Sequence, residues 1–344
     1  MRAFVPGREL AQAYYAEVVA PLVGDVPHSA ALLGYGSDVL GFDTSRSTDH
    51  GWGPRLQLFV RADAVAGARS RVEEGLPDEF RGWPTRYGWD DVPVADHVSV
   101  TTFGAWLERQ LGFDPRAGMT TVDWLTTPQQ LLLEVTCGAV FHDGLGEVEP
   151  VRAALAWFPD DVWRWLVGCQ WWRIDQEEPF VGRAAEVEDE LGSRVVAARL
   201  ARDAMRLCFL LERRYAPYSK WLGSAFAALE SASDVGPALE RMLEAPDFAE
   251  REAGWVSAVE SLATRHNALG LTDPLDPTVR LFHGRPFRVL DAGRFATATI
   301  ETVRDPLLRS LPRIGSVDQV VDSTDVLSLG DVARRFAAIY GPTR

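Results

Sequence analysis

The chain has 344 residues and a formal net charge of −14 at pH 7. Hydrophobic residues make up 47% of the sequence and charged residues 24%, which is the composition of an ordinary globular protein. The acidic balance argues against nucleic acid as a partner, because phosphate backbones repel negative charge. No apolar run approaches the roughly 18 residues of a membrane span, and the first residues lack the apolar core of a signal peptide. We therefore expect a cytoplasmic protein that has no membrane-spanning segment.

The first third of the chain alternates between predicted helices and strands. Apolar residues at helical spacing predict a helix over residues 7–23, and short apolar runs predict strands over 29–36 and 54–60. A further helix is predicted over 62–76, and a third strand over 96–103, where apolar and polar residues alternate. We therefore expect a small mixed α/β domain in this region.

The remainder of the chain is predicted to be mainly helical. Apolar residues recur at helical spacing in three segments, 128–141, 160–178 and 194–216. In the second segment this spacing puts five residues on one inner face, namely Val162, Trp165, Leu166, Cys169 and Trp172. A chain of this length exceeds the usual size of one domain. We predict an α+β protein with an α/β domain and its leading helix, a helical bundle, and a mixed extension packed on the bundle, at residues 1–118, 119–270 and 271–344.

The cysteines are widely spaced. Cys137, Cys169 and Cys208 lie in apolar contexts and do not show the spacing of a zinc site. Because free cysteine is among the most buried residue types, we predict buried thiols.

The segment after the first predicted strand is the least ordinary part of the chain. It contains a Gly-Ser turn, Gly36-Ser37, and reaches Asp49 just before the next predicted strand. A dinucleotide-binding G-x-G-x-x-G motif starting at Gly34 would need glycine where the chain has Val39. A Walker phosphate loop would need a following Gly-Lys-Ser/Thr, which is missing. One interpretation is a turn whose glycines serve backbone geometry alone.

A second interpretation comes from the order of residues in this segment. Gly36-Ser37, then Gly41, then Thr48-Asp49 at the next strand resembles the signature of the polymerase-beta-type nucleotidyltransferases. More closely, the chain resembles an uncharacterised bacterial branch of that superfamily, known only as a domain of unknown function (DUF4037-like). The likeness extends over nearly the whole chain and is carried by the segments GSDVLGFDTSRSTDHGWGPRLQLFV, RRYAPYSKWLGSAF and HGRPF.

The resemblance implies a nucleoside triphosphate bound with Mg²⁺ and transfer of its nucleotidyl group to a small hydroxylated or amine-bearing acceptor. Gly36 and Ser37 would hold phosphates, and Arg46 lies within reach of them. Asp49 would be a catalytic residue and a metal ligand in a two-ion site. The acidic net charge is compatible with a cationic acceptor.

The resemblance also implies contacts from the helical part of the chain. Tyr218 would contact phosphate or acceptor, and Lys220 would neutralise charge on the leaving pyrophosphate as a catalytic residue. The alternative is a surface lysine beside packing aromatics, although Lys220 is the single lysine of the chain. Arg213 and Arg214 would join the same site or pair with a nearby acid such as Glu212.

One expected acid is missing. The superfamily places a second metal-binding carboxylate at position 51, where this chain has Gly51. A later strand usually supplies a third acid, and the corresponding strand offers Asp96 at its mouth with Ser99 and Thr101 inside. Loss of a carboxylate removes charge that holds both ions. Asp38, Asp43 and His50 lie in the loop and could compensate, although none of them occupies the expected place.

Two further residues of this segment have expected roles. Arg55 flanks Asp49 within reach of phosphates, and Trp52, between two glycines, would stack on a base or sugar or else lie in the core. Our functional expectation is a nucleotidyltransferase-like protein that binds Mg-NTP. The alternatives are a catalytically impaired nucleotide-binding sensor or interaction protein, favoured by Gly51, and a helical scaffold whose α/β part is only structural.

Overall fold

The computed structural model describes residues 4–341, which divide into two compact units. Unit 1 comprises residues 4–119 with segments 130–156 and 328–335, and unit 2 comprises segments 120–129, 157–327 and 336–341. The predicted boundary after residue 118 lies next to the end of the first segment of unit 1. Segment 130–156 differs from the prediction, because it belongs to unit 1 rather than to a helical bundle at 119–270.

Unit 1 is built on a four-stranded sheet with the strand order β7-β2-β1-β8. The strands are β1 His28–Leu32, β2 Leu56–Val60, β7 Val98–Thr101 and β8 Ala139–Asp143. β2 runs antiparallel to β1 and parallel to β7. β8 pairs antiparallel with β1, so the predicted helix at 128–141 is wrong at its end: α7 covers Gln129–Thr136, and the chain then enters the sheet.

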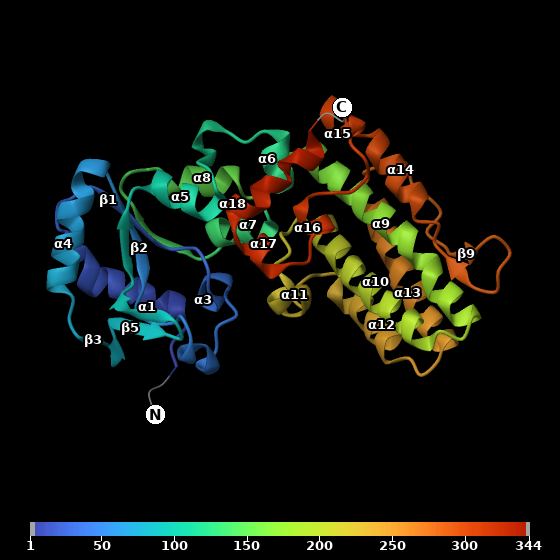
Figure 1. Cartoon of the computed structure of the whole chain (residues 1–344), viewed down its shortest axis with the longest axis horizontal. Coiled ribbons are helices and arrows are strands. Elements are labelled where there is room, and N and C mark those ends of the chain that lie inside the picture. The colour runs from blue at the N-terminus through green and yellow to red at the C-terminus, as the bar shows by residue number, and fades with distance from the viewer. Residues whose placement is uncertain (1–3, 342–344) are drawn as a thin grey trace. The chain divides into compact units, whose positions relative to one another are not determined.

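Helices from the first part of the chain cover one face of this sheet. The predicted helix at 7–23 consists of α1 Gly7–Tyr14, a π-helical turn Tyr15–Val19 and α2 Ala20–Val23, and α4 Val65–Gly75 packs on the same face (Figure 1). Alternate residues of the strands enter this core, because side chains of a strand point to opposite faces in turn. They are Ala30, Leu56, Leu58, Val60, Val98 and Val100.

Helix α5, Phe103–Leu111, covers the opposite face. The ring of Phe59 on β2 lies 4.9 Å from that of Phe103 and 5.7 Å from that of Trp106. The strand residues that alternate with the core positions point the same way as Phe59. They include Gln57 on β2 and Ser99 on β7, which are partners in the strand register. Two polar side chains therefore lie side by side on the α5 face.

Several short elements complete unit 1. Residues 77–97 form two small hairpins that the sequence did not predict, and β6 ends at Asp96 within the strand predicted at 96–103. The hairpins pair β3 Glu79–Phe80 with β4 Trp83–Pro84, and β5 Arg86–Trp89 with β6 Val92–Asp96. The short helices are α3 Ser37–Leu40, α8 Val148–Ala154 and α18 Gly330–Ala333.

Unit 2 is a helical bundle whose long helices lie side by side (Figure 1). They are α9 Asp160–Glu186, α10 Glu190–Leu211, α12 Ala232–Glu244 and α13 Phe248–Ala268. The predicted inner face of α9 is correct for Val162, Trp165, Leu166 and Cys169, whereas Trp171 rather than Trp172 is fully buried. Trp163, Trp165 and Trp171 are among the largest fully buried side chains of the described residues.

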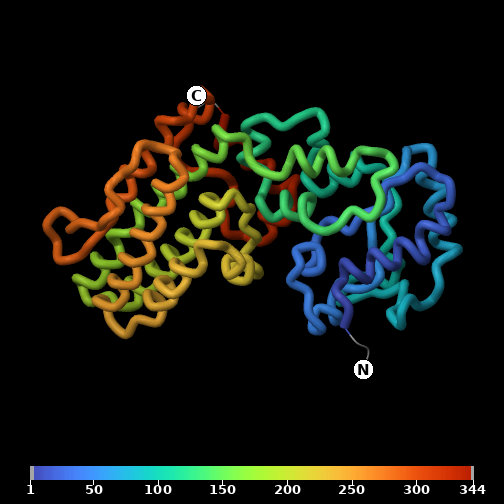
Figure 2. The backbone as a smooth tube through the Cα atoms, turned by 180° about the vertical axis from the view of Figure 1, so that it is seen from behind, coloured from blue at the N-terminus to red at the C-terminus, as the bar shows by residue number. Residues whose placement is uncertain are grey.

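The C-terminal part of unit 2 packs on the bundle, with α14 Gly293–Glu301 against α9. A hairpin of β9 Arg280–Leu281 and β10 Arg288–Val289 projects from the helices (Figures 1 and 2). The remaining short helices are α6 Thr121–Thr126, α11 Ser219–Phe226, α15 Pro306–Ser310, α16 Val317–Val320 and α17 Thr324–Ser328. The predicted α+β class is confirmed. Within residues 4–341, no helix combines the length and the apolar character that crossing a bilayer requires.

Candidate functional site

The Gly-Ser turn lies where β1 leaves the sheet and α3 begins. Gly36 has a φ of +131°, and a Cβ at this position would lie 2.3 Å from an oxygen of Asp38 and 2.4 Å from a nitrogen of Arg55. Glycine is therefore required here by backbone geometry and by close packing. Ser37 is half-buried, and its carbonyl oxygen accepts a hydrogen bond from the N–H of Phe42 at 2.8 Å.

Arg55 forms a buried ion pair with Asp38 immediately behind this turn. Its Nε and Nη2 donate to the two carboxylate oxygens at 3.0 and 2.6 Å, and Nη2 also donates to the carbonyl oxygen of Tyr35 at 2.7 Å. Both side chains are nearly inaccessible to solvent. The expectation that Arg55 contacts phosphate is therefore wrong, and Asp38 cannot replace a missing metal ligand, because each neutralises the other.

Asp43 and Trp52 also serve the structure. The indole N–H of Trp52 donates to Asp43 at 3.0 Å, and the same carboxylate oxygen accepts the backbone N–H of Gly7 at 2.7 Å. Trp52 is only 5% exposed and meets Trp83 edge to face, with 4.7 Å between ring centroids. It is therefore a core residue rather than a platform for a base or sugar, and Asp43 is the acceptor that satisfies its buried N–H.

Asp49 ends a 3₁₀ helix, Ser45–Asp49, and its side chain is exposed to solvent. Thr44 caps this helix by accepting the N–H of Arg46 at 3.2 Å, and the Arg46 side chain is exposed. His50 follows, and its Nδ1 lies 3.1 Å from a carboxylate oxygen of Asp90, with both side chains exposed. Asp49 and Arg46 are therefore both accessible to solvent.

A hollow of about 190 Å³ lies beside Asp49, and we call it the loop hollow. Residues 48–54 line one side, and the two small hairpins line the other through Trp83, Pro84, Tyr87, Gly88 and Trp89. Gly51 lies in this hollow with a φ of +62°, and a Cβ there would be 3.5 Å from the Trp89 ring. A side chain at position 51 would therefore meet ordinary contact distances but an unfavourable backbone conformation.

The residues present do not fit a two-ion magnesium site. Within residues 4–341, no group of three or more histidine, cysteine, aspartate or glutamate side chains is arranged to hold a metal. Asp38 and Asp43 are engaged in hydrogen bonds, and Gly51 offers no ligand atom. Asp49 is the remaining acid at the predicted metal position, and one carboxylate is too little charge for two divalent ions.

A second hollow of about 400 Å³ lies between the α5 face of the sheet and α5, and we call it the strand-end pocket. Asp96 and Ser99 line this pocket. Both lie at the strand from which the resemblance led us to expect a third acid. The pocket also holds Arg109 and Gln110 of α5, which the sequence analysis missed. The signal that could have identified them is their spacing of three and four residues from Trp106, which puts them on the same side of the helix as this buried residue.

The two hollows are adjacent. His97 lines the strand-end pocket and packs on Tyr87 and Trp89 of the loop hollow, with ring centroids 4.1 and 5.2 Å apart. A Cβ on Gly51 would lie 3.8 Å from the ring of Tyr35, which also lines the strand-end pocket. Asp49 lines the loop hollow, whereas Gly36 and Ser37 line neither of the two.

Lys220 and Tyr218 belong to unit 2. Tyr218 precedes α11, and Lys220 in its first turn is exposed, with Nζ 4.9 Å from the ring centroid of Trp221. The contact with Trp221 is the arrangement expected of a surface lysine beside an aromatic residue. Their roles in binding remain predictions from the sequence.

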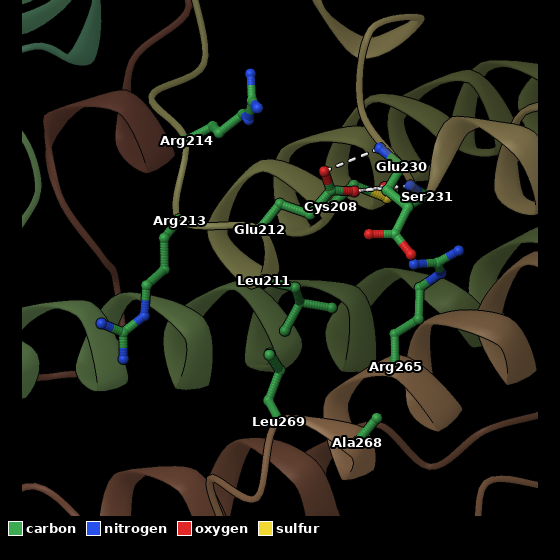
Figure 3. A pocket seen from close by; sticks show the side chains of 10 residues that line it. All are labelled: Cys208, Leu211, Glu212, Arg213, Arg214, Glu230, Ser231, Arg265, Ala268 and Leu269. Carbon is green, nitrogen blue, oxygen red and sulfur yellow. Dashed lines mark hydrogen bonds between the residues drawn. The ribbon is translucent and has the colours of Figure 1, made fainter.

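Unit 2 has a hollow of its own, of about 510 Å³, at the ends of α10 and α13 (Figure 3). The carboxylate of Glu212 already has partners there, because it accepts hydrogen bonds from the backbone N–H groups of Glu230 and Ser231. Arg213 stacks on Trp163 at 3.8 Å and lies 3.4 Å from Asp160. Arg213 therefore pairs with Asp160 rather than with Glu212.

Comparison with known proteins identifies similarity in one part of the chain. Residues 124–222 match the family described as "Domain of unknown function (DUF4037)". Neither a curated protein nor a solved structure matches the chain. The match runs from α6 to α11 and does not include residues 36–51, from which the nucleotidyltransferase resemblance was drawn. Over residues 124–222 the chain is thus similar to a family whose function is not known.

Proposed function

We propose that unit 1 binds a nucleoside triphosphate at the loop that carries Gly36, Ser37, Arg46 and Asp49, without the paired metal carboxylates of an active nucleotidyltransferase. The observation that carries the proposal is that the acidic residues of the loop differ in whether their carboxylates already have partners within the protein. Asp38 and Asp43 are engaged internally, whereas Asp49 is exposed beside a hollow. The exposed guanidinium of Arg46 adds a positive charge on the same loop.

A single Mg²⁺ is compatible with this arrangement. Magnesium in nucleotide sites is usually bound through one or two carboxylates together with phosphate oxygens and water. Asp49 would supply the carboxylate, and an ion that arrives with the triphosphate would neutralise part of its charge. The protein would then act as a nucleotide sensor or interaction protein.

The test is calorimetric titration of the full chain with each nucleoside triphosphate, with and without Mg²⁺. We expect Mg²⁺-dependent binding of at least one nucleotide and about tenfold weaker binding by Asp49→Asn, since a charge contact to the bound ion is lost. Asp63→Asn, an exposed acid elsewhere in unit 1, is the matched control. Absence of binding by any nucleotide, or equal affinity of Asp49→Asn and wild type, would contradict the proposal.

Nucleotidyl transfer to a small molecule is the second candidate function. It is favoured by the strand-end pocket, which lies next to the loop hollow and is large enough for a small acceptor. Release of pyrophosphate from a bound triphosphate by the wild-type chain would establish transfer.

A further inference from the structure

The strand-end pocket is built where polar residues replace the apolar packing of the α5 face. Further along β2, Phe59 packs on Phe103 and Trp106 and closes the space between sheet and helix. At the start of the strands, Gln57 and its register partner Ser99 take the place of such rings. The space left between them and α5 is the pocket.

Most polar groups in the walls are already satisfied within the protein. The side-chain amide of Gln57 accepts the N–H of Leu33 at 2.7 Å and donates to the carbonyl oxygen of Leu33 at 3.0 Å. The charge of Arg55 is neutralised by Asp38. These walls are therefore held in place before any ligand enters, which reduces the ordering cost of binding.

The buried carboxylate of Glu134 on α7 fixes another wall. It accepts hydrogen bonds from the side-chain amides of Gln110 and of Gln130, the latter at 2.7 Å. The backbone carbonyl of the same residue accepts the N–H of Gly34 at 2.8 Å. Burial raises the pKa of the Glu134 carboxyl, and the hydrogen bonds from the two amides oppose this rise because they stabilise the charged carboxylate. Gln110 is thereby held at the pocket from the α5 side.

Three groups that line the pocket are left to interact with a ligand. Within residues 4–341, the guanidinium of Arg109 and the hydroxyl of Ser99 form no hydrogen bond or ion pair with protein groups, and both side chains are exposed. Asp96 uses one carboxylate oxygen to accept the N–H of Val98 at 3.3 Å, which leaves the other oxygen available. Arg109 thus offers a ligand a guanidinium without an ion-pair partner, and Asp96 offers it one carboxylate oxygen.

We propose that the strand-end pocket binds a small molecule that carries an anionic group and neighbouring hydroxyl groups. The anionic group, a carboxylate or a phosphate, pairs with Arg109, because guanidinium donors match the geometry of both. The hydroxyl groups donate to Asp96 and exchange hydrogen bonds with Ser99. Its volume lies within the range of small-molecule sites. This binding does not depend on a bound nucleotide.

The experiment titrates the full chain with four probes of similar size in the absence of nucleotide. Glycerate and glycerol 3-phosphate carry hydroxyl groups and an anionic group, glycerol carries only the hydroxyls, and ethanolamine carries a cation. We expect one or both anionic probes to bind at millimolar concentration, with glycerol and ethanolamine at least about tenfold weaker. The preferred anionic probe identifies the ligand as a carboxylate or a phosphate.

Two variants locate the binding. Arg109→Gln should weaken the bound anionic probe about tenfold, while Arg61→Gln, an exposed arginine of unit 1 outside the pocket, should leave it unchanged. Both arginines are exposed, so neither variant should lower the free energy of unfolding appreciably. ATP affinity, measured on the same samples, should be equal in wild type and Arg109→Gln.

The outcomes decide between this proposal and the proposed nucleotide site. No binding by either anionic probe, equal binding of ethanolamine, or full affinity in Arg109→Gln would overturn it. A parallel loss of ATP affinity in Arg109→Gln would also overturn it, because Arg109 would then belong to the triphosphate site. Failure of every nucleoside triphosphate to bind would contradict the nucleotide proposal and leave the result with the anionic probes unaffected.

Discussion

Arg55 at the entrance of β2 reaches back 17 residues to Asp38 and binds both of its carboxylate oxygens, at 3.0 and 2.6 Å. The same guanidinium holds the carbonyl oxygen of Tyr35. Three parts of the loop between β1 and β2 are therefore tied together by one buried cation. These hydrogen bonds hold together the two ends of the loop that contains Asp49 and Gly51.

Removing the carboxylate of this pair should destabilise unit 1 strongly. Asp38→Ala leaves a buried guanidinium without its counterion, and loss of one partner of a buried pair costs about 3–5 kcal/mol. We expect a reduction of that size in the free energy of unfolding, measured by urea denaturation. Asp63→Ala removes an exposed acid and should change stability by less than about 0.5 kcal/mol. Equal stabilities of the two variants would show that the pair is not the tie we describe.

Restoring an acid at position 51 separates the effect of charge from that of shape. The φ of +62° costs an ordinary side chain about 1 kcal/mol, although Asp and Asn tolerate this conformation best. We expect Gly51→Asp and Gly51→Asn to fold with similar small losses of stability. Only the aspartate should tighten Mg²⁺-dependent ATP binding, by about tenfold in calorimetry. Equal affinities of the two variants would place the metal elsewhere.

His266 should make unit 2 less stable in mild acid. It is fully buried in the bundle, where Nδ1 accepts the indole N–H of Trp171 at 3.1 Å, and desolvation lowers its pKa from 6.5 to about 4. Below pH 6.5 the unfolded chain binds a proton that the folded chain does not. The contribution of neutral His266 to the free energy of unfolding is therefore fully present above pH 6.5. It falls by about 3 kcal/mol as the pH decreases toward 4.

The variant His266→Gln isolates this contribution. Glutamine keeps an acceptor for Trp171 but has no titrating group in this range. Urea unfolding at pH 7, 5.5 and 4.5 should therefore show a steeper loss of stability in wild type than in His266→Gln. Parallel pH profiles of the two proteins would be inconsistent with a neutral buried imidazole.

The three thiols should differ in reactivity. Cys169 and Cys208 are buried, and burial raises the pKa of both, that of Cys208 to about 12. Cys137 is partly exposed. Because the thiolate is the reactive form, we expect a disulfide reagent to modify at most Cys137 in the native chain and all three after denaturation. Cys137→Ser should abolish the native reaction, and rapid modification of a second thiol would contradict the described burial.

The predictions that succeeded depend on local periodicity. The helix at 7–23, the strands that became β1 and β2, and the inner face of α9 each follow from apolar spacing within one element. The sequence therefore determined the α+β class and located α1, α2, α4, α9 and α10. It also singled out the loop that contains Arg46 and Asp49, from the order of its glycine, serine and acidic residues.

The tertiary structure decided what depends on distant partners. Residues 139–143 form a strand because β1, more than a hundred residues earlier, supplies the hydrogen-bond partners. Arg55 pairs with Asp38 instead of the phosphate that was expected, and of the two alternatives for Trp52 the structure shows the core position, with Asp43 as its acceptor. The strand-end pocket needs Ser99 and Arg109 to meet across a sheet and a helix. Periodicity shows which face of an element is apolar, whereas only the packed chain determines which polar groups find a partner and which stay free for a ligand.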